Sequence, residues 1–366
     1  MPMTDELLGP QRVSELGRIL ADADPAAAQH SMSAAARSLD GLALSARARL
    51  LAVAIRDDHG RTPEALNALV RAALDDPDFT GWMLWPAGLA VAWSAVEHDT
   101  HEALDNALDV LRELTPRMSS EFSIRPLLRH DLDRSLGHLS EWTTHSSWHV
   151  RRLASEGSRP LLPWAERIPA LVADTTPSRP ILDALFDDPE ESVRRSVANH
   201  LNDHSRAHEQ FTVDTVLGWQ RRGGTHVDRT TRHALRTLVK RGDPGALDVL
   251  GFGSAQLTVS ALRLESVRVP IGGELRFAAD ITNVGATSAR LVIDYVLAFP
   301  DARGRERVKV FKLAQRELSP GASTTVTTAQ SFRPITTRTY YPGTAAIALQ
   351  INGVMQDRAV FELGVA

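Results

Sequence analysis

The sequence predicts a multidomain α + β protein, with an α-helical domain of stacked repeats over residues 1–254 and an all-β sandwich over residues 255–366. In the first part, apolar residues recur at three- and four-residue spacing in Ala-, Leu- and Arg-rich segments. After Gly251-Phe-Gly-Ser254 the spacing changes to two, which is typical of strands. At roughly 100–200 residues per domain, a chain of 366 residues has room for two domains.

Helices are expected where the helical spacing is bounded by Gly, Pro and Asp-Pro turns. The clearest examples are Pro63–Ala73, His101–Leu114, Ser192–Leu201 and Thr230–Lys240. Spacings near 40 residues between similar segments are those of HEAT-like helical pairs, so the sequence predicts a solenoid with a concave face.

Two alignments carry the repeat. Val150-Arg-Arg-Leu-Ala-Ser-Glu156 aligns with Val193-Arg-Arg-Ser-Val-Ala-Asn199, 43 residues later. Arg195-Ser-Val-Ala-Asn-His-Leu201 aligns more weakly with Arg232-His-Ala-Leu-Arg-Thr-Leu238, 37 residues later.

The last 112 residues read as about seven strands, close to the size of an immunoglobulin-like sandwich. The alternating runs are Phe277, Ala279 and Ile281; Leu291, Ile293, Tyr295 and Leu297; and Ala345, Ile347, Leu349 and Ile351. Asn352-Gly353, which follows the last run, is a strong two-residue hairpin signal. The chain has no cysteine, so the predicted sandwich lacks the disulfide of antibody domains.

Composition excludes several classes of protein. Without cysteine there is no disulfide, zinc ribbon, iron–sulfur cluster or thiol nucleophile. The acidic N-terminus does not resemble a signal peptide, and the longest apolar stretch, Trp82–Val96, contains Pro86 and is too short to span a bilayer. We therefore expect a cytoplasmic protein. The net charge of −4 does not exclude nucleic acid as a partner, because one basic face is enough.

The repeats place charged residues on one helix face. Arg152, Glu156 and Arg159 follow one another at helical spacing, and stacking of the repeats would align Arg152 with Arg195 and Arg232. Two interpretations stay open at this point. The stripe is a solvated face with ion pairs within each helix, or it is an arginine track along a phosphate backbone.

Other side chains near these repeats have equally ordinary alternatives. Glu121 and Asp203 suit helix ends or turns, whereas three carboxylates in one basic groove would indicate chemistry. Trp164 follows Pro160-Leu-Leu-Pro163 in a turn and is the best candidate for an exposed aromatic side chain. His204 and His208 are four residues apart, but no His-Glu-x-x-His sequence is present and no metal site is predicted.

These residues carry a family resemblance. The chain resembles the AlkC branch of the AlkC/AlkD superfamily of bacterial DNA alkylation-repair glycosylases, in the subtype with a C-terminal immunoglobulin-like domain. The motifs that carry it are Glu121-Phe-Ser-Ile-Arg-Pro126, Trp148-His-Val-Arg-Arg-Leu-Ala-Ser-Glu-Gly157, Arg159-Pro-Leu-Leu-Pro-Trp164 and Val193-Arg-Arg-Ser-Val-Ala-Asn-His-Leu-Asn-Asp203.

The resemblance implies a DNA glycosylase of base excision repair. Members hydrolyse the N-glycosidic bond of cationic alkylated bases, 3-methyladenine and for AlkC also 3-methylcytosine, and are thought not to flip the base into a pocket. The expected partner is double-stranded DNA that contains alkylated bases, with no cofactor and no membrane partner. We expect the chain to act as a monomer.

The resemblance also assigns roles residue by residue. They are catalytic carboxylates (Glu121, Glu156, Asp203), contacts to the lesion or sugar (Trp164, Arg152) and contacts to the DNA backbone (Arg159, Arg195, Arg232). The alternative to an enzyme is a non-catalytic HEAT-repeat scaffold that binds DNA or a protein. In the β-domain, a loop with Arg303, Arg305, Arg307 and Lys309 is either a second contact to the duplex or an ordinary solvated loop.

Overall fold

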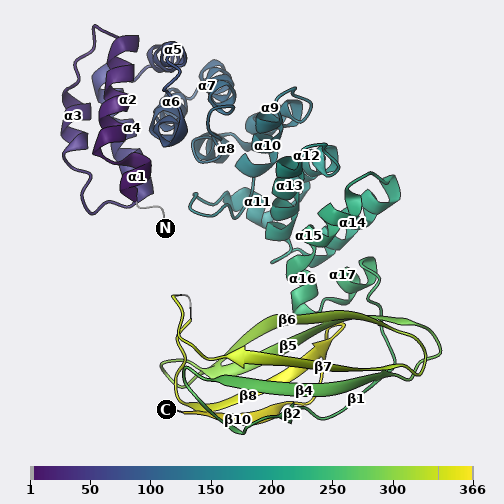
Figure 1. The fold of residues 1–366 in the computed structure, drawn as a ribbon. Helices are drawn as coiled ribbons and strands as arrows, with labels where there is room; N and C mark the ends of the chain where they lie inside the picture. Colours follow the sequence, from purple (N-terminus) through teal and green to yellow (C-terminus); the bar gives the residue numbers. More distant parts are fainter. Residues whose placement is uncertain (1–3, 337, 365–366) are drawn as a thin grey trace. The chain divides into compact units, whose positions relative to one another are not determined.

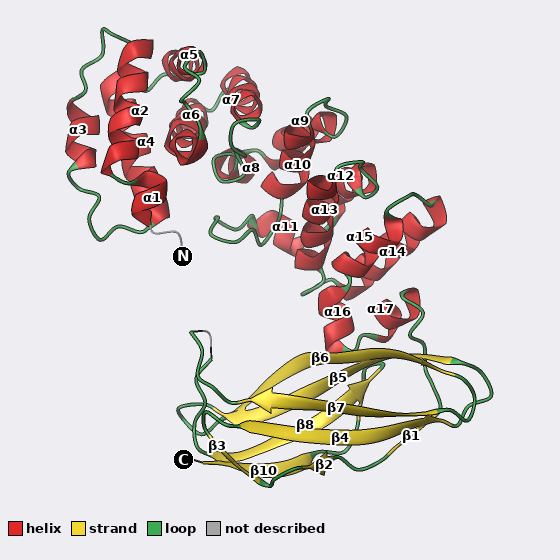
Figure 2. Cartoon of the chain, viewed as in Figure 1, coloured by secondary structure: helices red, strands yellow, loops and turns green. Residues whose placement is uncertain are grey.

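The computed structural model describes residues 4–336 and 338–364. The chain divides into two compact units, Met1–Ala234 and Leu235–Ala366. Figures 1 and 2 show that helices make up the first unit and that strands dominate the second. The predicted α + β class, helices followed by a β-sandwich, is therefore confirmed.

The first unit is a succession of helices joined by short loops. Its α-helices are α1 (Thr4–Leu8), α2 (Pro10–Ala23), α3 (His30–Ala36), α4 (Leu44–His59), α5 (Pro63–Ala73), α6 (Leu84–His98), α7 (His101–Leu114), α8 (Arg125–His130), α9 (Leu132–Trp142), α10 (Trp148–Gly157), α11 (Pro169–Ala173), α12 (Arg179–Leu185), α13 (Glu191–His204), α14 (Glu209–Arg222) and α15 (Val227–Ala234). Two 3₁₀ turns, η1 (Gly81–Met83) and η2 (Thr176–Ser178), precede α6 and α12.

The helices that carry the predicted site stack on one another. Helix α10 packs against α9, α12 and α13, and α13 packs against α15. In α13, Val193, Val197 and Leu201 are fully buried on one face, and each such side chain contributes about 1.5–3 kcal/mol on burial. The Glu190 side chain accepts a hydrogen bond from the Ser192 amide and so caps the start of α13.

The second unit is built around two sheets. Its strands are β1 (Leu257–Val259), β2 (Arg263–Leu264), β3 (Arg268–Pro270), β4 (Glu274–Asn283), β5 (Ala289–Pro300), β6 (Glu306–Leu318), β7 (Ser323–Ser331), β8 (Gly343–Ile351), β9 (Val354–Met355) and β10 (Ala359–Gly364). One sheet has the order β1-β4-β2 with β7 paired to β4, and the other has the order β3-β10-β8-β5-β6 with β9 paired to β8. All pairings are antiparallel except that of β10 with β3.

The core of the sandwich consists of the alternating residues predicted from the sequence. All members of the three runs, from Phe277 to Ile351, are buried in one hydrophobic cluster. The hairpin prediction is also confirmed, because Asn352 and Gly353 join β8 to β9 with φ values of 45° and 80°. Positive φ at both central positions is what a type I′ turn requires.

Two short helices belong to the second unit. They are α16 (Arg236–Arg241) and α17 (Pro244–Val249), and Leu247 and Phe252 pack against Val292 of β5. This contact buries Val292, and every residue of β5 except Arg290 is buried. Helices give way to strands between Val249 and Leu257, whereas the compact unit begins at Leu235. The domain boundary at residue 254 stays a prediction.

None of the described helices combines the length and the apolar character that crossing a membrane would require.

Candidate active site

Helix α10 positions the first two charged residues of the site. Its buried face consists of Val150, Leu153 and Ala154, which pack into the repeat core. Arg152 and Glu156 are one helical turn apart on another face, with 3.7 Å between Arg152 Nη2 and Glu156 Oε1. The helical spacing therefore brings the two side chains together as predicted.

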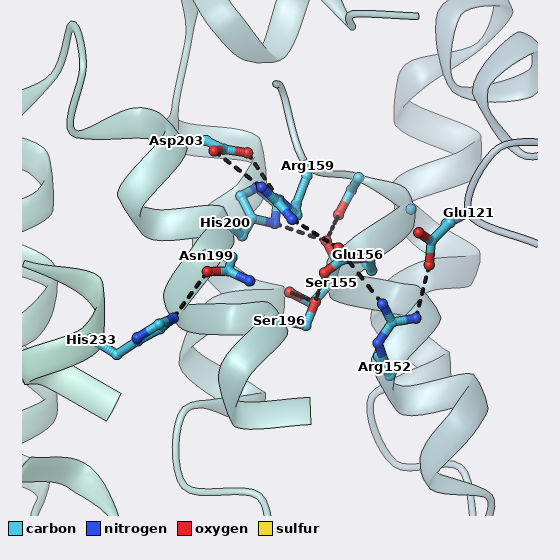
Figure 3. A network of polar contacts seen from close by, with 12 residues as sticks. Glu121, Arg152, Ser155, Glu156, Arg159, Ser196, Asn199, His200, Asp203 and His233 are labelled. Carbon is cyan, nitrogen blue, oxygen red and sulfur yellow. Dashed lines mark hydrogen bonds and ion pairs between the residues drawn. The ribbon is translucent and has the colours of Figure 1, made fainter. Parts of the chain in front are cut away.

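Both carboxylate oxygens of Glu156 are held by donors (Figure 3). Arg159 Nη1 donates to Oε1 at 2.8 Å, and the Ser196 hydroxyl of α13 donates to Oε2 at 2.6 Å. The Glu156 side chain is only 7% exposed. A carboxylate this deeply buried is stable only when paired and hydrogen-bonded, and these donors meet that requirement.

Arg159 joins Glu156 to Asp203, which lies 44 residues later in α13. Its Nε and Nη2 donate to the two oxygens of Asp203 at 2.9 and 3.2 Å, the paired geometry of a strong ion pair (Figure 3). Burial acts to lower the pKa of Arg159, but its hydrogen bonds and charge interactions with Asp203 and Glu156 outweigh burial and raise it. All three guanidinium nitrogens of the buried Arg159 side chain thus already donate to carboxylates.

Glu121 enters the network from a different part of the chain. It lies in the turn before α8, whose second residue is Pro126, as the sequence predicts. Its Oε2 accepts a hydrogen bond from Arg152 Nη1 at 2.8 Å, and its side chain is 15% exposed. Within the described residues, its Oε1 has no hydrogen-bonding partner. Glu121 therefore keeps one oxygen available.

The repeats form equivalent contacts. Glu156 and Asn199 are aligned in the sequence, and so are Ser196 and His233. Ser196 hydrogen-bonds Glu156 at 2.6 Å, and His233 Nε2 lies 3.0 Å from Asn199 Oδ1 (Figure 3). The same contact between neighbouring helices thus recurs, once with a carboxylate and once with an amide.

An open cleft of about 360 Å³ lies beside the carboxylates. Its lining includes Glu121, Glu156 and Arg159 together with apolar residues, of which the aromatic members are Trp82, Phe122 and Trp164. Asp203 is not part of this lining. An aromatic wall beside two carboxylates that are each held by an arginine favours a cation. Among the described residues that line the cleft, the one basic side chain, Arg159, already donates to carboxylates.

Trp164 is the exposed aromatic residue that the sequence predicts. Its side chain is 78% exposed and borders the cleft, and its backbone has a φ of 66°. A residue other than glycine in this left-handed region costs on the order of 1–3 kcal/mol, and such strain is concentrated at functional sites.

Sequence reasoning missed two residues of the aromatic wall. The rings of Trp82 and Phe122 are stacked with centroids 6.2 Å apart, and Phe122 also contacts Trp85 at 4.6 Å. Phe122 directly follows Glu121 in the motif, and this adjacency could have identified it as a residue of the site. Trp82 lies in the turn η1, and no sequence pattern connects it with Glu121.

Arg195 and Arg232 stand apart from the network. Both side chains are exposed, on α13 and α15, and within the described residues neither forms an ion pair. In the aligned Val-Arg-Arg motifs that begin at Val150 and Val193, the first arginine is structural instead. Arg151 pairs with Asp188, and Arg194 donates to the Asp188 carbonyl. The structure therefore separates Arg159, which is buried and engaged, from the other two residues predicted to contact phosphates.

The histidines of α13 do not form a metal centre. Across residues 4–336 and 338–364, no group of three or more potential ligands is suited to a metal ion. His200 and His204 are buried, and neither ring nitrogen of His204 has a hydrogen-bonding partner in that part of the chain.

Comparison with known proteins places these features in context. Residues 258–365 match the family described as "Uncharacterised protein YhaZ, C-terminal Ig-like domain". The uncharacterized protein YhaZ of Bacillus subtilis (strain 168) is 37% identical over 262 residues, which cover 71% of this chain and 72% of that protein.

A solved structure is similar over nearly the whole chain. It is the alkylpurine DNA glycosylase AlkC of Pseudomonas fluorescens, bound to DNA that contains an abasic site analog. The sequences are 29% identical, the match covers 99% of both chains, and the TM-score is 0.85. The similarity thus includes both compact units.

Proposed function

Because the chain belongs to the AlkC branch of the AlkC/AlkD superfamily of DNA alkylation-repair glycosylases, in the subtype with a C-terminal immunoglobulin-like domain, we propose that it hydrolyses the N-glycosidic bond of cationic alkylated bases in duplex DNA. The proposed substrates are 3-methyladenine and 3-methylcytosine, acted on without flipping the base. The observation that carries this proposal is the pair of arginine-held carboxylates, Glu121 and Glu156, beside an aromatic-walled cleft.

The chemistry follows from the charge of the substrate. An alkylated base that is already cationic leaves as a neutral molecule, so no general acid is needed to protonate it. The remaining tasks are to stabilise the positive charge that develops on the sugar and to position the attacking water. Carboxylates that are ionised and fixed beforehand perform both tasks, and the reaction needs no cofactor.

The contacts distinguish the roles of the two glutamates. Among the described residues, one oxygen of Glu121 has no hydrogen-bonding partner, and Glu121 is the more exposed of the two, so we assign it the water. Glu156 has donors on both oxygens and supplies negative charge beside the sugar. Trp164 covers the sugar or the cationic base, where an aromatic face stabilises positive charge, and Arg152 orients Glu121.

The contacts lead us to revise two of the predicted roles. Both oxygens of Asp203 are bound by Arg159, and Asp203 does not line the cleft, so we assign it the role of holding Arg159. Arg159 in turn holds Glu156 rather than a phosphate. Arg195 and Arg232, exposed and without carboxylate partners among the described residues, keep the proposed contact to the DNA backbone.

The deciding experiment is release of free methylated bases from duplex DNA treated with dimethyl sulfate. We expect the wild-type chain to release 3-methyladenine or 3-methylcytosine, and Glu121→Gln to lower the rate by about 100-fold, as loss of a major charge-stabilising group does. Glu113→Gln, which removes a carboxylate paired with Arg71 outside the cleft, is the matched control and should keep the wild-type rate. A folded wild-type chain that binds DNA but releases no base would leave the non-catalytic scaffold as its function.

The second unit offers a further contact to the duplex. A basic groove of about 520 Å³ is lined by Arg303, Arg305, Arg307, Lys309 and Arg338, with Asp301 as its carboxylate. Asp301 pairs with Arg305, and Arg338 donates to the Tyr340 hydroxyl, which leaves the exposed Arg303, Arg307 and Lys309 to face phosphate. We propose that this groove binds the DNA backbone.

The test of the groove uses the full chain with Arg307→Ala and Lys309→Ala combined. We expect the dissociation constant for duplex DNA to rise about tenfold at low salt and the difference to shrink as salt increases. Arg263→Ala, which removes a basic side chain of β2 that pairs with Asp280 of β4, is the control. Equal affinity of the double variant and the wild type would make the groove an ordinary solvated surface.

A further inference from the structure

One buried charge takes no part in the proposed chemistry. Arg125, the first residue of α8, belongs to the motif that begins at Glu121, and its side chain is only 2% exposed. Burial and the nearby charge of Arg159 lower its pKa to about 10, so the guanidinium is still protonated at neutral pH. Within the described residues Arg125 forms no ion pair. A buried cation of this kind needs other acceptors.

Those acceptors are backbone carbonyls at the two ends of one segment. Arg125 Nη1 donates to the carbonyls of Gly157 and Arg159 at 2.9 and 2.7 Å. On the other side, Nε donates to the carbonyl of Glu166 at 2.8 Å, and Nη2 donates to the same oxygen. A single planar guanidinium thus joins the start of the segment 157–166 to its end.

The segment between these ends carries Trp164. It contains Pro160 and Pro163, which lack amide donors, and the Ala165 amide donates to the Leu162 carbonyl at 3.3 Å. Trp164 itself is exposed and has a positive φ, so its own side chain does little to hold it in place. The position of the ring must therefore be set mainly by the anchored ends.

We propose that Arg125 is a positioning residue that clamps the segment 157–166 and so fixes Trp164 at the rim of the carboxylate cleft. This inference rests on the proposed glycosylase function for its effect on rate, but not for the clamp itself. Lysine would keep the charge at this position while losing the planar fork that reaches both ends of the segment.

The clamp is tested first without DNA, by hydrogen exchange of backbone amides in the full-length chain. Arg125→Lys should raise the exchange rate of amides in residues 158–166 about tenfold, while those of α6 and α13 exchange as in the wild type. Arg194→Lys is the matched control, because Arg194 is also buried and donates to two backbone carbonyls, of Asp188 and Pro189. Unchanged exchange of residues 158–166 in folded Arg125→Lys would overturn the proposal, whether or not the chain is a glycosylase.

The link to Trp164 is tested by a double-mutant cycle of base release. Arg125→Lys should slow release about tenfold when Trp164 is present and less than twofold in a Trp164→Ala background, because the two residues would act as one unit. Equal effects in both backgrounds would overturn the assignment to Trp164. If the wild-type chain had no glycosylase activity, only the proposed function would be contradicted. The hydrogen-exchange experiment would still test whether Arg125 clamps the segment 157–166.

A loop-side variant covers the case in which Arg125→Lys does not fold. Pro163→Gly frees the backbone next to Trp164 without changing a buried residue. It should raise exchange in residues 158–166 and slow base release severalfold with Trp164 still present. Wild-type exchange and wild-type release in Pro163→Gly would contradict the requirement that this segment be held rigid.

Discussion

At the scale of single residues, Glu156 shows how a buried charge is held in place. Its carboxylate is nearly buried, yet each oxygen has its own donor, a guanidinium on one and the Ser196 hydroxyl on the other. Ser196 in turn lies 3.1 Å from the Ser155 hydroxyl. A small hydroxyl therefore fixes the direction in which a buried negative charge points.

Removing that hydroxyl should affect both rate and stability. In Ser196→Ala one oxygen of Glu156 loses its donor, so we expect base release to slow about tenfold and the free energy of unfolding to fall by about 1–3 kcal/mol. Ser196→Thr, which keeps the hydroxyl, should recover most of the rate. The measurements are single-turnover base release and urea denaturation.

Ser94→Ala provides the comparison for Ser196→Ala. Ser94 is a buried serine of α6 whose hydroxyl donates to the Arg61 carbonyl and, in the part of the chain that the structure describes, to no carboxylate. Its removal should lower stability without slowing base release. If both alanine variants slowed release to the same extent, the role of Ser196 would be general stability only.

At the scale of elements, α13 contributes to the site and also carries a pH-sensitive core. His204 is buried near its C-terminal end, and burial together with the neighbouring His208 lowers the pKa of His204 to about 4. Burial also lowers the pKa of His200 well below its ordinary value. Both rings are therefore neutral in the folded chain at a pH where they are charged in the unfolded chain.

The consequence is a loss of stability in acid. The unfolded state takes up protons as the pH falls below about 6.5, whereas folded His204 does so only near pH 4, so stability declines between these values. His204 alone should cost about 2 kcal/mol between pH 7.5 and pH 5. Denaturant unfolding at the two pH values measures this change in the free energy of unfolding.

Substitution of His204 isolates its contribution. In His204→Phe the difference between pH 7.5 and pH 5 should shrink by about that amount, because an apolar ring takes up no proton in either state. His101→Phe, at the exposed start of α7, should leave the difference unchanged. An undiminished pH dependence in His204→Phe would show that other groups cause it.

The elements also show what sequence patterns can and cannot predict. The alternation in β4, β5 and β8 identified the sandwich core, because alternate residues of a strand point to the same face of the sheet. Helical spacing placed Arg152 and Glu156 correctly on one face of α10, since their contact is local. The pairing of Arg159 with Asp203 and the stacking of Trp82 on Phe122 were missed, because both depend on how separate helices meet. The contact of α17 with β5 was missed for the same reason.

At the scale of the whole molecule, the net charge of −4 conceals an uneven distribution. The exposed arginines of α13 and α15 recur at equivalent repeat positions, which suits a backbone with regularly spaced phosphates. Each of the proposed contacts would release counterions on DNA binding, so its contribution would depend on salt.

Removal of these arginines should therefore change the salt dependence of binding. For Arg195→Gln and for Arg232→Gln, we expect the slope of log affinity against log salt to fall in magnitude by about 1 each. Arg37→Gln, at the exposed end of α3, is the control and should keep the wild-type slope. Identical slopes in all variants would exclude Arg195 and Arg232 as phosphate contacts.

The exposure of Trp164 has an optical consequence. The chain has seven tryptophans, all in the described residues, and the Trp164 side chain is the exposed one, whereas Trp85, Trp142 and Trp219 are buried. An indole in water emits at longer wavelengths and is quenched by acrylamide more readily than one in the core. We therefore expect the red edge of the fluorescence spectrum to come mainly from Trp164 at the rim of the cleft, so that its emission would report occupancy of the cleft without a dye.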